Sequence, residues 1–392
     1  MRQAGFAWWA VVAAASRLPL AMMPLSLVLL GSAGGGSLSR GGLLAGAFTA
    51  GEVVAAPLVA SRISVSFGLA MMGAGAVGLA AAAQYRGPGW VLVLLAAGMG
   101  VTGAGVPGQL RAHLASLLPV RLRPAGYGLE TTASAAFYAA GPALVAVLAG
   151  IDASAAPLAY GGLLLVSAPL GLRIARQVRA SGAAARQVQV AAVLVRVWPL
   201  CLGAAAFMAS VTALDVAIPG LLSERGHNPG ASGYLLGGFA ASGVVGGLVY
   251  AARTWPGSRI AQSTGVTLGM CGLLAFVPLV AETWLLATLI VLAGVFGPPS
   301  LISRSVHAEA VLAPPELATG FSALSAAAGL GASLAAFGAA FLVAEVAVAT
   351  ALWTILGVTA TFTVLAAVMT GGHAGPTAAG ATKDSADPVL RP

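Results

Sequence analysis

The stretch GFAWWAVVAAASRLPLAMMPLSLVLLG, residues 5–31, decides the class of fold. A helix needs roughly 20 apolar residues to cross a bilayer core of about 30 Å, and this run is longer, with Arg17 as its one charge. A cleaved signal peptide has an apolar core of only about 7–15 residues. Because the run is continuously apolar and not alternating, it predicts a membrane helix and not a barrel strand.

The whole chain shares this apolar character. Of its 392 residues 59% are hydrophobic and 8% are charged, with a mean hydropathy of +0.94. Soluble domains carry about 25% charged residues, so soluble enzymes, nucleic-acid binders and disordered chains are excluded. The prevalence of Ala, Gly and Arg, with Lys383 as the one lysine, indicates a GC-rich genome and therefore a bacterial cytoplasmic membrane.

No motif in the sequence indicates a metal, a cofactor or an enzyme. Cys201 and Cys271 lie in separate apolar runs without metal-type spacing, and no phosphate-binding Gly-Lys-Ser loop occurs. The histidines are all expected in loops or in the tail: His113, His227, His307 and His373. We therefore expect no metal, no cofactor and no ATP-driven step.

Twelve apolar stretches of membrane-spanning length are separated by charged or Gly/Pro-rich breaks. The predicted spans are Gly5–Gly31, Gly42–Ala60, Ser66–Gln84, Trp90–Leu110, Tyr127–Gly150, Pro157–Leu172, Val197–Leu222, Ser232–Ala252, Ile260–Val280, Thr283–Ser303, Leu317–Val343 and Val346–Thr370. The fold class is therefore an all-α, multi-pass membrane protein.

The cationic residues predict the orientation, because cytoplasmic loops are enriched in Lys and Arg. With the N-terminus inside, 15 of the 19 cationic residues fall on cytoplasmic segments and 3 on outer loops. Arg111 and Arg304 are counted among the cytoplasmic ones. Both termini are therefore expected in the cytoplasm, and the net charge of +8 is a topology signal and not a nucleic-acid site.

The two halves of the chain repeat one another. Arg62 follows the second span and Arg253 follows the eighth, 191 positions later, while Tyr127 and Phe321 are 194 positions apart. We predict a six-helix half at residues 1–172, a basic cytoplasmic linker at 173–196, a second six-helix half at 197–370 and a disordered tail at 371–392. Two parallel six-helix halves are typical of one large class of transporters.

Several segments resemble the major facilitator superfamily, and more closely a small actinobacterial branch of it. They are Ser16-Arg17-Leu18-Pro19, Leu117-Leu118-Pro119, Tyr127-Gly128-Leu129-Glu130, Gly141-Pro142, Leu248-Val249-Tyr250, Trp255-Pro256-Gly257, Leu312-Ala313-Pro314-Pro315 and Gly329-Leu330-Gly331. The resemblance covers essentially the whole chain. It implies two halves that rock around a central cavity lined by the first, fourth, seventh and tenth spans.

The chain also departs from the superfamily pattern. The loop after the second span has Ser61 before Arg62, where the superfamily has an aspartate. The exporter-associated pattern of the fifth span persists as Gly141-Pro142, while Val145 and Ala146 replace its later glycines. The resemblance implies proton-driven export, and the changed loop leaves open a non-transporting relative.

Charged residues inside spans are costly and are therefore candidates for function. Arg17 lies about 15 Å into its span at 1.5 Å per residue, and Glu52 reaches nearly the same depth from the opposite side. We predict that the two form a buried pair. Such a pair either fixes the helix packing or meets substrate and protons, and both alternatives stay open.

Three further groups are candidates for gating or coupling. Asp215 lies in the outer third of its span, before Pro219, and either couples protons or packs as a hydrated carboxylate. Glu130, near the cytoplasmic face, is predicted to pair with Arg111, Arg121 or Arg123, as a structural contact or as part of a cytoplasmic gate. Arg62 and Arg253 occupy equivalent loop positions in the two halves and are candidates for the same gate.

Glycine and proline are concentrated in the fourth and tenth spans. Gly103, Gly105 and Pro107 interrupt one, and Gly297 and Pro298 interrupt the other. Equivalent breaks in corresponding helices point to the binding site of a transporter. Small residues also allow close helix packing, which is the alternative explanation.

These observations predict a monomeric secondary transporter in the cytoplasmic membrane. Its partners are a small organic substrate, protons as the coupling ion and the lipid bilayer. Proton-coupled export is the first expectation. Uptake of a metabolite, or a sensor or scaffold role without transport, is the alternative.

Overall fold

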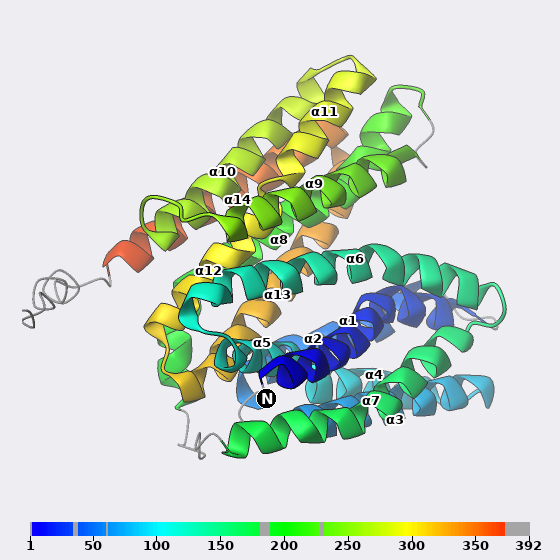
Figure 1. Ribbon diagram of the computed structural model, residues 1–392. Helices are drawn as coiled ribbons and strands as arrows, with labels where there is room; N and C mark the ends of the chain where they lie inside the picture. Colours follow the sequence, from blue (N-terminus) through cyan, green and yellow to red (C-terminus); the bar gives the residue numbers. More distant parts are fainter. Residues whose placement is uncertain (1, 34–37, 60–61, 181–188, 228–230, 373–392) are drawn as a thin grey trace, which may run out of the picture.

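The computed structural model describes residues 2–33, 38–59, 62–180, 189–227 and 231–372. Helices make up nearly all of this part of the chain (Figure 1). The α-helices are α1 (Arg2–Ser32), α2 (Leu38–Val59), α3 (Val65–Gln84), α4 (Gly89–Gly103), α5 (Val106–Leu117), α6 (Arg123–Ala149), α7 (Ala155–Ala180), α8 (Val190–Glu224), α9 (Ser232–Ala252), α10 (Arg259–Phe276), α11 (Thr283–Gly294), α12 (Gly297–Val311), α13 (Leu317–Glu345) and α14 (Val348–Gly372). Short 3-10 turns, η1 (Val120–Leu122), η3 (Val277–Leu279) and η4 (Pro314–Glu316), join some of them.

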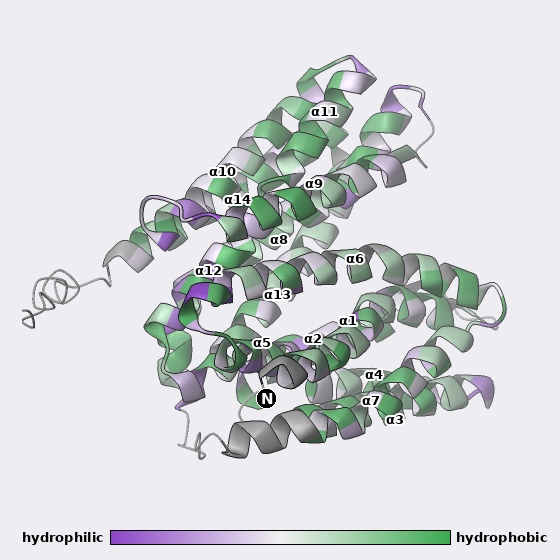
Figure 2. Cartoon of the chain, in the orientation of Figure 1, coloured by the Kyte–Doolittle hydropathy of each residue, from purple (hydrophilic) through white to green (hydrophobic). Residues whose placement is uncertain are grey.

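The predicted all-α fold with twelve spans is confirmed. The described residues form 12 helical segments long and apolar enough to cross a membrane, including Gly5–Gly31 and Ser232–Ala252 with the predicted bounds. Two of the spans are each built from two helices, α4 with α5 and α11 with α12. Figure 2 shows hydrophobic residues along the helices and hydrophilic residues concentrated at their ends, as a bilayer requires.

The predicted ends of two spans were wrong. The fourth span was expected to end at Leu110 and the tenth at Ser303, but their helices continue to Leu117 and Val311. Arg111 and Arg304, counted as cytoplasmic, therefore lie within membrane helices, as do His113 and His307, which were expected in loops. Arg111, His113 and Arg304 contact other polar groups of the protein, so these polar residues do not end the helix. The real stop signal is the proline that follows each helix, Pro119 or Pro314.

The helices form two bundles, α1–α7 and α8–α14, here named the first and second bundle (Figure 1). We call the face where α1 begins and α14 ends the N-terminal face. The bundles approach each other around α5, α12 and α13 and diverge toward the opposite face. One apolar core runs through the first bundle and continues across to Ile302 and Phe321, whereas the other stays within the second bundle. The bundles are thus joined near the N-terminal face.

Contacts between the bundles repeat the internal symmetry of the sequence. A Cβ added at Gly108 would lie 2.0 Å from the hydroxyl of Ser322, and one added at Gly128 would lie 3.5 Å from Ile302. Residue 302 follows Gly108 by 194 positions, and residue 322 follows Gly128 by the same number. Each contact is therefore the symmetry mate of the other, as at a two-fold interface.

Two residues related by the same interval even touch each other. The rings of Tyr127 and Phe321 meet edge to face, with centroids 6.0 Å apart. The pseudo-two-fold axis therefore passes between α6 and α13 at this level.

The predicted linker and tail are described only in part. Helix α7 continues to Ala180 and α8 begins at Val190, so helices extend into the predicted linker at 173–196. Residues 181–188 of the linker and 373–392 of the tail lie outside the described residues.

Candidate functional site

A cluster of two arginines and one carboxylate lies where three helices of the first bundle meet. Glu130 on α6 is 4% exposed. One of its oxygens accepts from Arg17 on α1, and the other accepts from Nε of Arg111 on α5 at 2.5 Å. One carboxylate thus neutralises only one of two guanidinium charges.

This cluster corrects the predicted pair of Arg17 with Glu52. Arg17 pairs with Glu130, and no ion pair joins Glu52 to a described side chain. Sequence distance indicates how deep a side chain lies but not which way it points around the helix axis, so depth alone chose the wrong carboxylate. Of the three arginines considered for Glu130, Arg111 makes the contact.

Glu52 still belongs to the same electrostatic neighbourhood. The charge of Arg17 acts on Glu52 and on the hydroxyl of Tyr138, a residue of α6. Glu52 is half-buried, and Tyr138 is 54% exposed. An ionisable side chain in a membrane span normally faces a bundle interior or a water-filled space. Unlike Glu130, Glu52 is not held in an ion pair with a described residue. Tyr138 had no signal in the sequence.

A second polar cluster ties the two bundles together at the N-terminal face. Glu309 on α12 forms an ion pair with Arg123 at the start of α6 and accepts a hydrogen bond from the hydroxyl of Tyr127 at 3.1 Å. Arg111 adds a third link, since its Nη1 donates to the hydroxyl of Ser305 at 3.2 Å. All three bonds must break if the bundles separate here. Glu309 was not singled out from the sequence. It is an acidic residue just before the end of α12, seven residues before Glu316.

The other predicted site residues lie apart from these clusters. Arg62 is exposed between α2 and α3, Arg253 is exposed after α9, and neither makes an ion pair with a described residue. Asp215 is an exposed residue of α8, also without an ion pair in the described part of the chain. Its exposure shows that the described helices do not enclose it.

The predicted helix breaks lie at the joints of two spans. Gly103 ends α4, Gly105 precedes α5 and Pro107 opens it, while Gly297 and Pro298 open α12. The glycines just before each joint serve close packing. A Cβ at Gly100 would lie 2.0 Å from the backbone of α2, and one at Gly294 would lie 2.1 Å from the backbone of α9.

Gly141 and Pro142 lie in the middle of α6. A Cβ added at Gly141 would meet Ala21 of α1 at 2.8 Å, so this glycine lets the two helices approach closely. Among the described residues, no three or more His, Cys, Asp or Glu side chains are placed to hold a metal ion.

Comparison with known proteins places the fold. No family model matches the chain, and no curated protein matches it in sequence. A bacterial homologue of the iron transporter ferroportin, in an outward-facing state with soaked iron, is 14% identical over 95% of this chain and 98% of its own, with a TM-score of 0.74. The human organic anion transporter TETRAN is 15% identical over 93% and 99%, with a TM-score of 0.70. The fucose:proton symporter of E. coli is 14% identical over 93% and 98%, with a TM-score of 0.67.

These similarities define the class of protein. The chain is a multi-pass membrane protein of twelve spans. It has the major facilitator fold, whose solved examples here are transporters.

Proposed function

We propose that the chain is a secondary active transporter that exports a small organic molecule in exchange for protons. The arrangement of the two bundles is the observation that supports this proposal. The bonds of Glu309 and Arg111 join the bundles at one face. Two rigid bodies held by a few polar contacts at one face, with apolar surface elsewhere, are suited to rocking between two states.

We further propose that the N-terminal face is cytoplasmic and that the membrane is the bacterial cytoplasmic membrane. The arginine distribution supports this orientation, because Arg253 and Arg259 lie at the N-terminal face and few cations lie opposite. The bonds between the bundles would then lie at the cytoplasmic face.

Paired cysteines test the orientation. Cys201 and Cys271 are first replaced by Ala. Thr254→Cys, in the exposed loop after α9, then reports on the N-terminal face, and Tyr85→Cys, 87% exposed, reports on the opposite one. A membrane-impermeant maleimide added to intact cells should label Tyr85→Cys and spare Thr254→Cys. The reverse pattern contradicts the orientation.

Two carboxylates support proton coupling. Glu52 and Asp215 lie inside spans, one in each bundle, and neither is held in an ion pair with a described residue. A group that must gain and lose a proton in each cycle cannot be permanently neutralised by an arginine. Arg17, the predicted partner of Glu52, pairs with Glu130 instead. Glu52 and Asp215 are therefore both candidates for the group that binds and releases the coupling proton.

The test uses everted membrane vesicles and ethidium as the first probe, followed by other amphipathic fluorescent compounds. A cation is chosen because both free groups are acidic. An imposed pH gradient should drive ethidium into vesicles that contain the protein, and either Asp215→Asn or Glu52→Gln should abolish this accumulation while passive exchange remains. Glu282→Gln, in an exposed loop, is the matched control.

The outcomes separate the alternatives. Accumulation driven in the opposite direction indicates uptake. If both neutral variants keep full pH-driven transport, the protein is not proton-coupled through these residues. If no compound of the panel moves in vesicles or shifts the melting temperature, the sensor or scaffold interpretation is favoured, in line with Ser61 in place of the superfamily's aspartate before Arg62.

A further inference from the structure

A buried arginine inside the second bundle has no carboxylate among the described side chains to balance it. Arg304 on α12 is 4% exposed. Among the described side chains no Asp or Glu lies within ion-pair distance of its guanidinium. An arginine keeps its proton under all ordinary conditions, so the second bundle contains a full positive charge.

The contacts that Arg304 does make are with neutral groups. Its Nη2 donates to the hydroxyl of Thr267 at 3.0 Å, and that hydroxyl bonds to Ser300 at 2.8 Å. The ring of Phe207 lies 5.4 Å from the guanidinium carbon. These contacts orient the side chain and partly offset its charge, but they leave Nη1 buried and without a hydrogen-bond partner.

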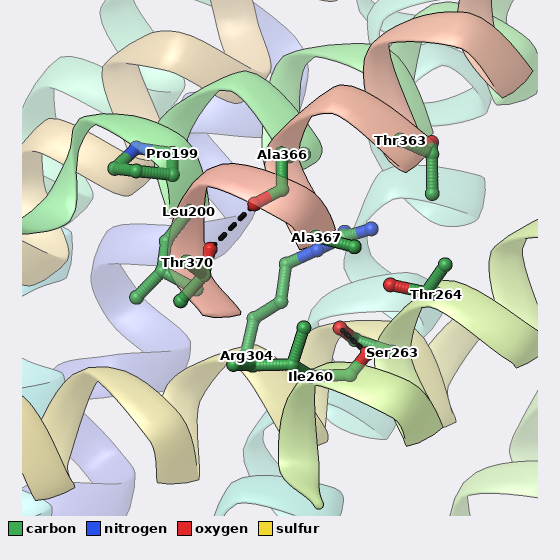
Figure 3. Close-up of a pocket in the computed structure, with 11 residues that line it drawn as sticks. Pro199, Leu200, Ile260, Ser263, Thr264, Arg304, Thr363, Ala366, Ala367 and Thr370 are labelled. Atoms are coloured by element: carbon green, nitrogen blue, oxygen red, sulfur yellow. Dashed lines mark hydrogen bonds between the residues drawn. The ribbon is translucent and has the colours of Figure 1, made fainter. Parts of the chain in front are cut away.

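The unsatisfied nitrogen belongs to the lining of a small cavity. The cavity lies among α8, α10, α12 and α14, and its volume is about 20 Å³. Figure 3 shows the guanidinium of Arg304 extending into it between Thr264 and Thr363. The hydroxyl of Thr363 is also buried and has no partner. Two orphaned polar groups, one of them cationic, therefore line the same space.

Size and charge together define the occupant. A water molecule needs about 10–15 Å³ of such space, so the cavity holds one small particle and has no room for a phosphate group. A water would satisfy the hydrogen bonds but leave the charge unbalanced, and an unpaired buried charge is costly. A small anion satisfies both requirements at once.

We propose that this cavity binds a single small monovalent anion, of which chloride is the natural example. The anion accepts hydrogen bonds from Nη1 of Arg304 and from the hydroxyl of Thr363. Its lining includes the start of α10 and the end of α14, both at the N-terminal face, so its access is from that face. The site is built from helices of the second bundle, and Arg304 is next along α12 to Ser305, which accepts from Arg111 of the first bundle. The ion site does not rest on the proposed transport.

Chloride dependence of thermal stability tests the proposal. The purified full-length protein is kept at constant ionic strength while sodium gluconate is replaced by sodium chloride. The melting temperature of the wild-type protein should rise by a few degrees and saturate, because an ion that binds only the folded state stabilises it. Sulfate, which is too large, should give no rise. An unchanged melting temperature in chloride contradicts the proposal.

Variants assign the effect to the site. Arg304→Met should abolish the chloride response, and in gluconate it should melt no lower than the wild type, because it removes the unbalanced charge. Arg196→Met is the matched control, since Arg196 is a more exposed arginine paired with Glu316, and it should keep the full response. A chloride response that persists in Arg304→Met overturns the assignment.

A second measurement covers the case in which Arg304→Met fails to fold. Crystals of the wild-type protein grown in bromide should show an anomalous peak beside Arg304. Bromide peaks elsewhere but not in this cavity would contradict the site. Stabilisation by phosphatidylglycerol in place of chloride, lost in Arg304→Lys, would assign the charge to a lipid headgroup and overturn the small-ion proposal.

Discussion

The two bundles differ in the groups that surround a buried arginine. In the first bundle, Arg17 and Arg111 share the carboxylate of Glu130. In the second, Arg304 contacts the hydroxyl of Thr267 and the ring of Phe207, and it forms no ion pair with a described residue. The first cluster has one carboxylate for two arginines, whereas Arg304 has no described carboxylate within ion-pair distance. An arginine can therefore hold helices together through an ion pair, or it can supply the positive charge of an ion-binding site.

Position relative to the bundle interface adds a second difference. Arg111 also reaches Ser305 of the opposite bundle, so the first cluster changes when the bundles move. Arg304 contacts only helices of its own bundle. The cluster around Glu130 can therefore respond to movement of the bundles, whereas the site at Arg304 is suited to a bound ion. Four predictions test this contrast, from the largest expected effect to the smallest.

Loss of the shared carboxylate should have the largest effect. Glu130→Gln leaves two buried guanidinium groups without an anion, and removal of one partner from a buried pair costs about 3–5 kcal/mol. The melting temperature in detergent should drop steeply, and Glu130→Gln combined with Arg17→Met should recover part of the loss. If Glu130→Gln melted like the wild type, Glu130 would not be the group that balances the cluster.

Removal of a neutral partner of Arg304 should have a smaller effect. Thr267→Val deletes the hydroxyl that accepts from Nη2 and leaves that nitrogen unsatisfied, which costs about 1–3 kcal/mol. The free energy of unfolding of the two proteins, measured in the same chloride buffer, gives the difference. Thr354→Val, which removes an exposed hydroxyl bonded to its own helix at 2.8 Å, is the control and should be nearly neutral. Equal effects of the two variants would mean that Arg304 does not depend on Thr267.

Breaking the link between the bundles should change conformation more than stability. Glu309→Gln removes the ion pair with Arg123, a partly exposed contact worth about 1 kcal/mol, which is a few-fold change in the population of states. Spin labels at Val120 and Thr254, one in each bundle, should show a larger share of long distances by double electron–electron resonance.

The control for that measurement breaks an ion pair within one bundle. Glu316→Gln removes the contact with Arg196, and both residues belong to the second bundle. The distance distribution should then stay as in the wild type. Identical distributions for Glu309→Gln and the wild type would show that Glu309 does not hold the bundles together.

The smallest effect on stability is expected for Glu52. Because no ion pair with a described residue depends on this carboxylate, Glu52→Gln should change the free energy of unfolding by no more than about 0.5 kcal/mol. Thermal melts of Glu52→Gln and Glu130→Gln compare the loss of stability at a carboxylate outside the ion pairs with the loss at a carboxylate that accepts from two arginines. A loss as large as that of Glu130→Gln would restore the original pairing of Glu52 with Arg17.

The overall fold was readable from the sequence because the bilayer sets a length scale. Spans such as Ser232–Ala252 follow from runs of apolar residues, and the joints at Gly103 and Gly297 follow from glycine and proline. The ends at Leu110 and Ser303 were misplaced because an arginine or a histidine was taken as the start of a loop. A polar residue ends a span only if it faces lipid.

The twelve spans and the repeat between the halves could be predicted from the residues alone, since both depend on local hydrophobicity and on spacing along the chain. The three-dimensional arrangement was needed to show that Arg17 meets Glu130, that Glu309 joins the bundles and that Arg304 forms no ion pair with a described carboxylate. Those facts depend on the rotation of each helix about its axis and on which helices are neighbours. Helix rotation and helix neighbours are set by packing among many small and apolar side chains, such as Ala, Gly and Leu. No single residue in the sequence therefore predicts them.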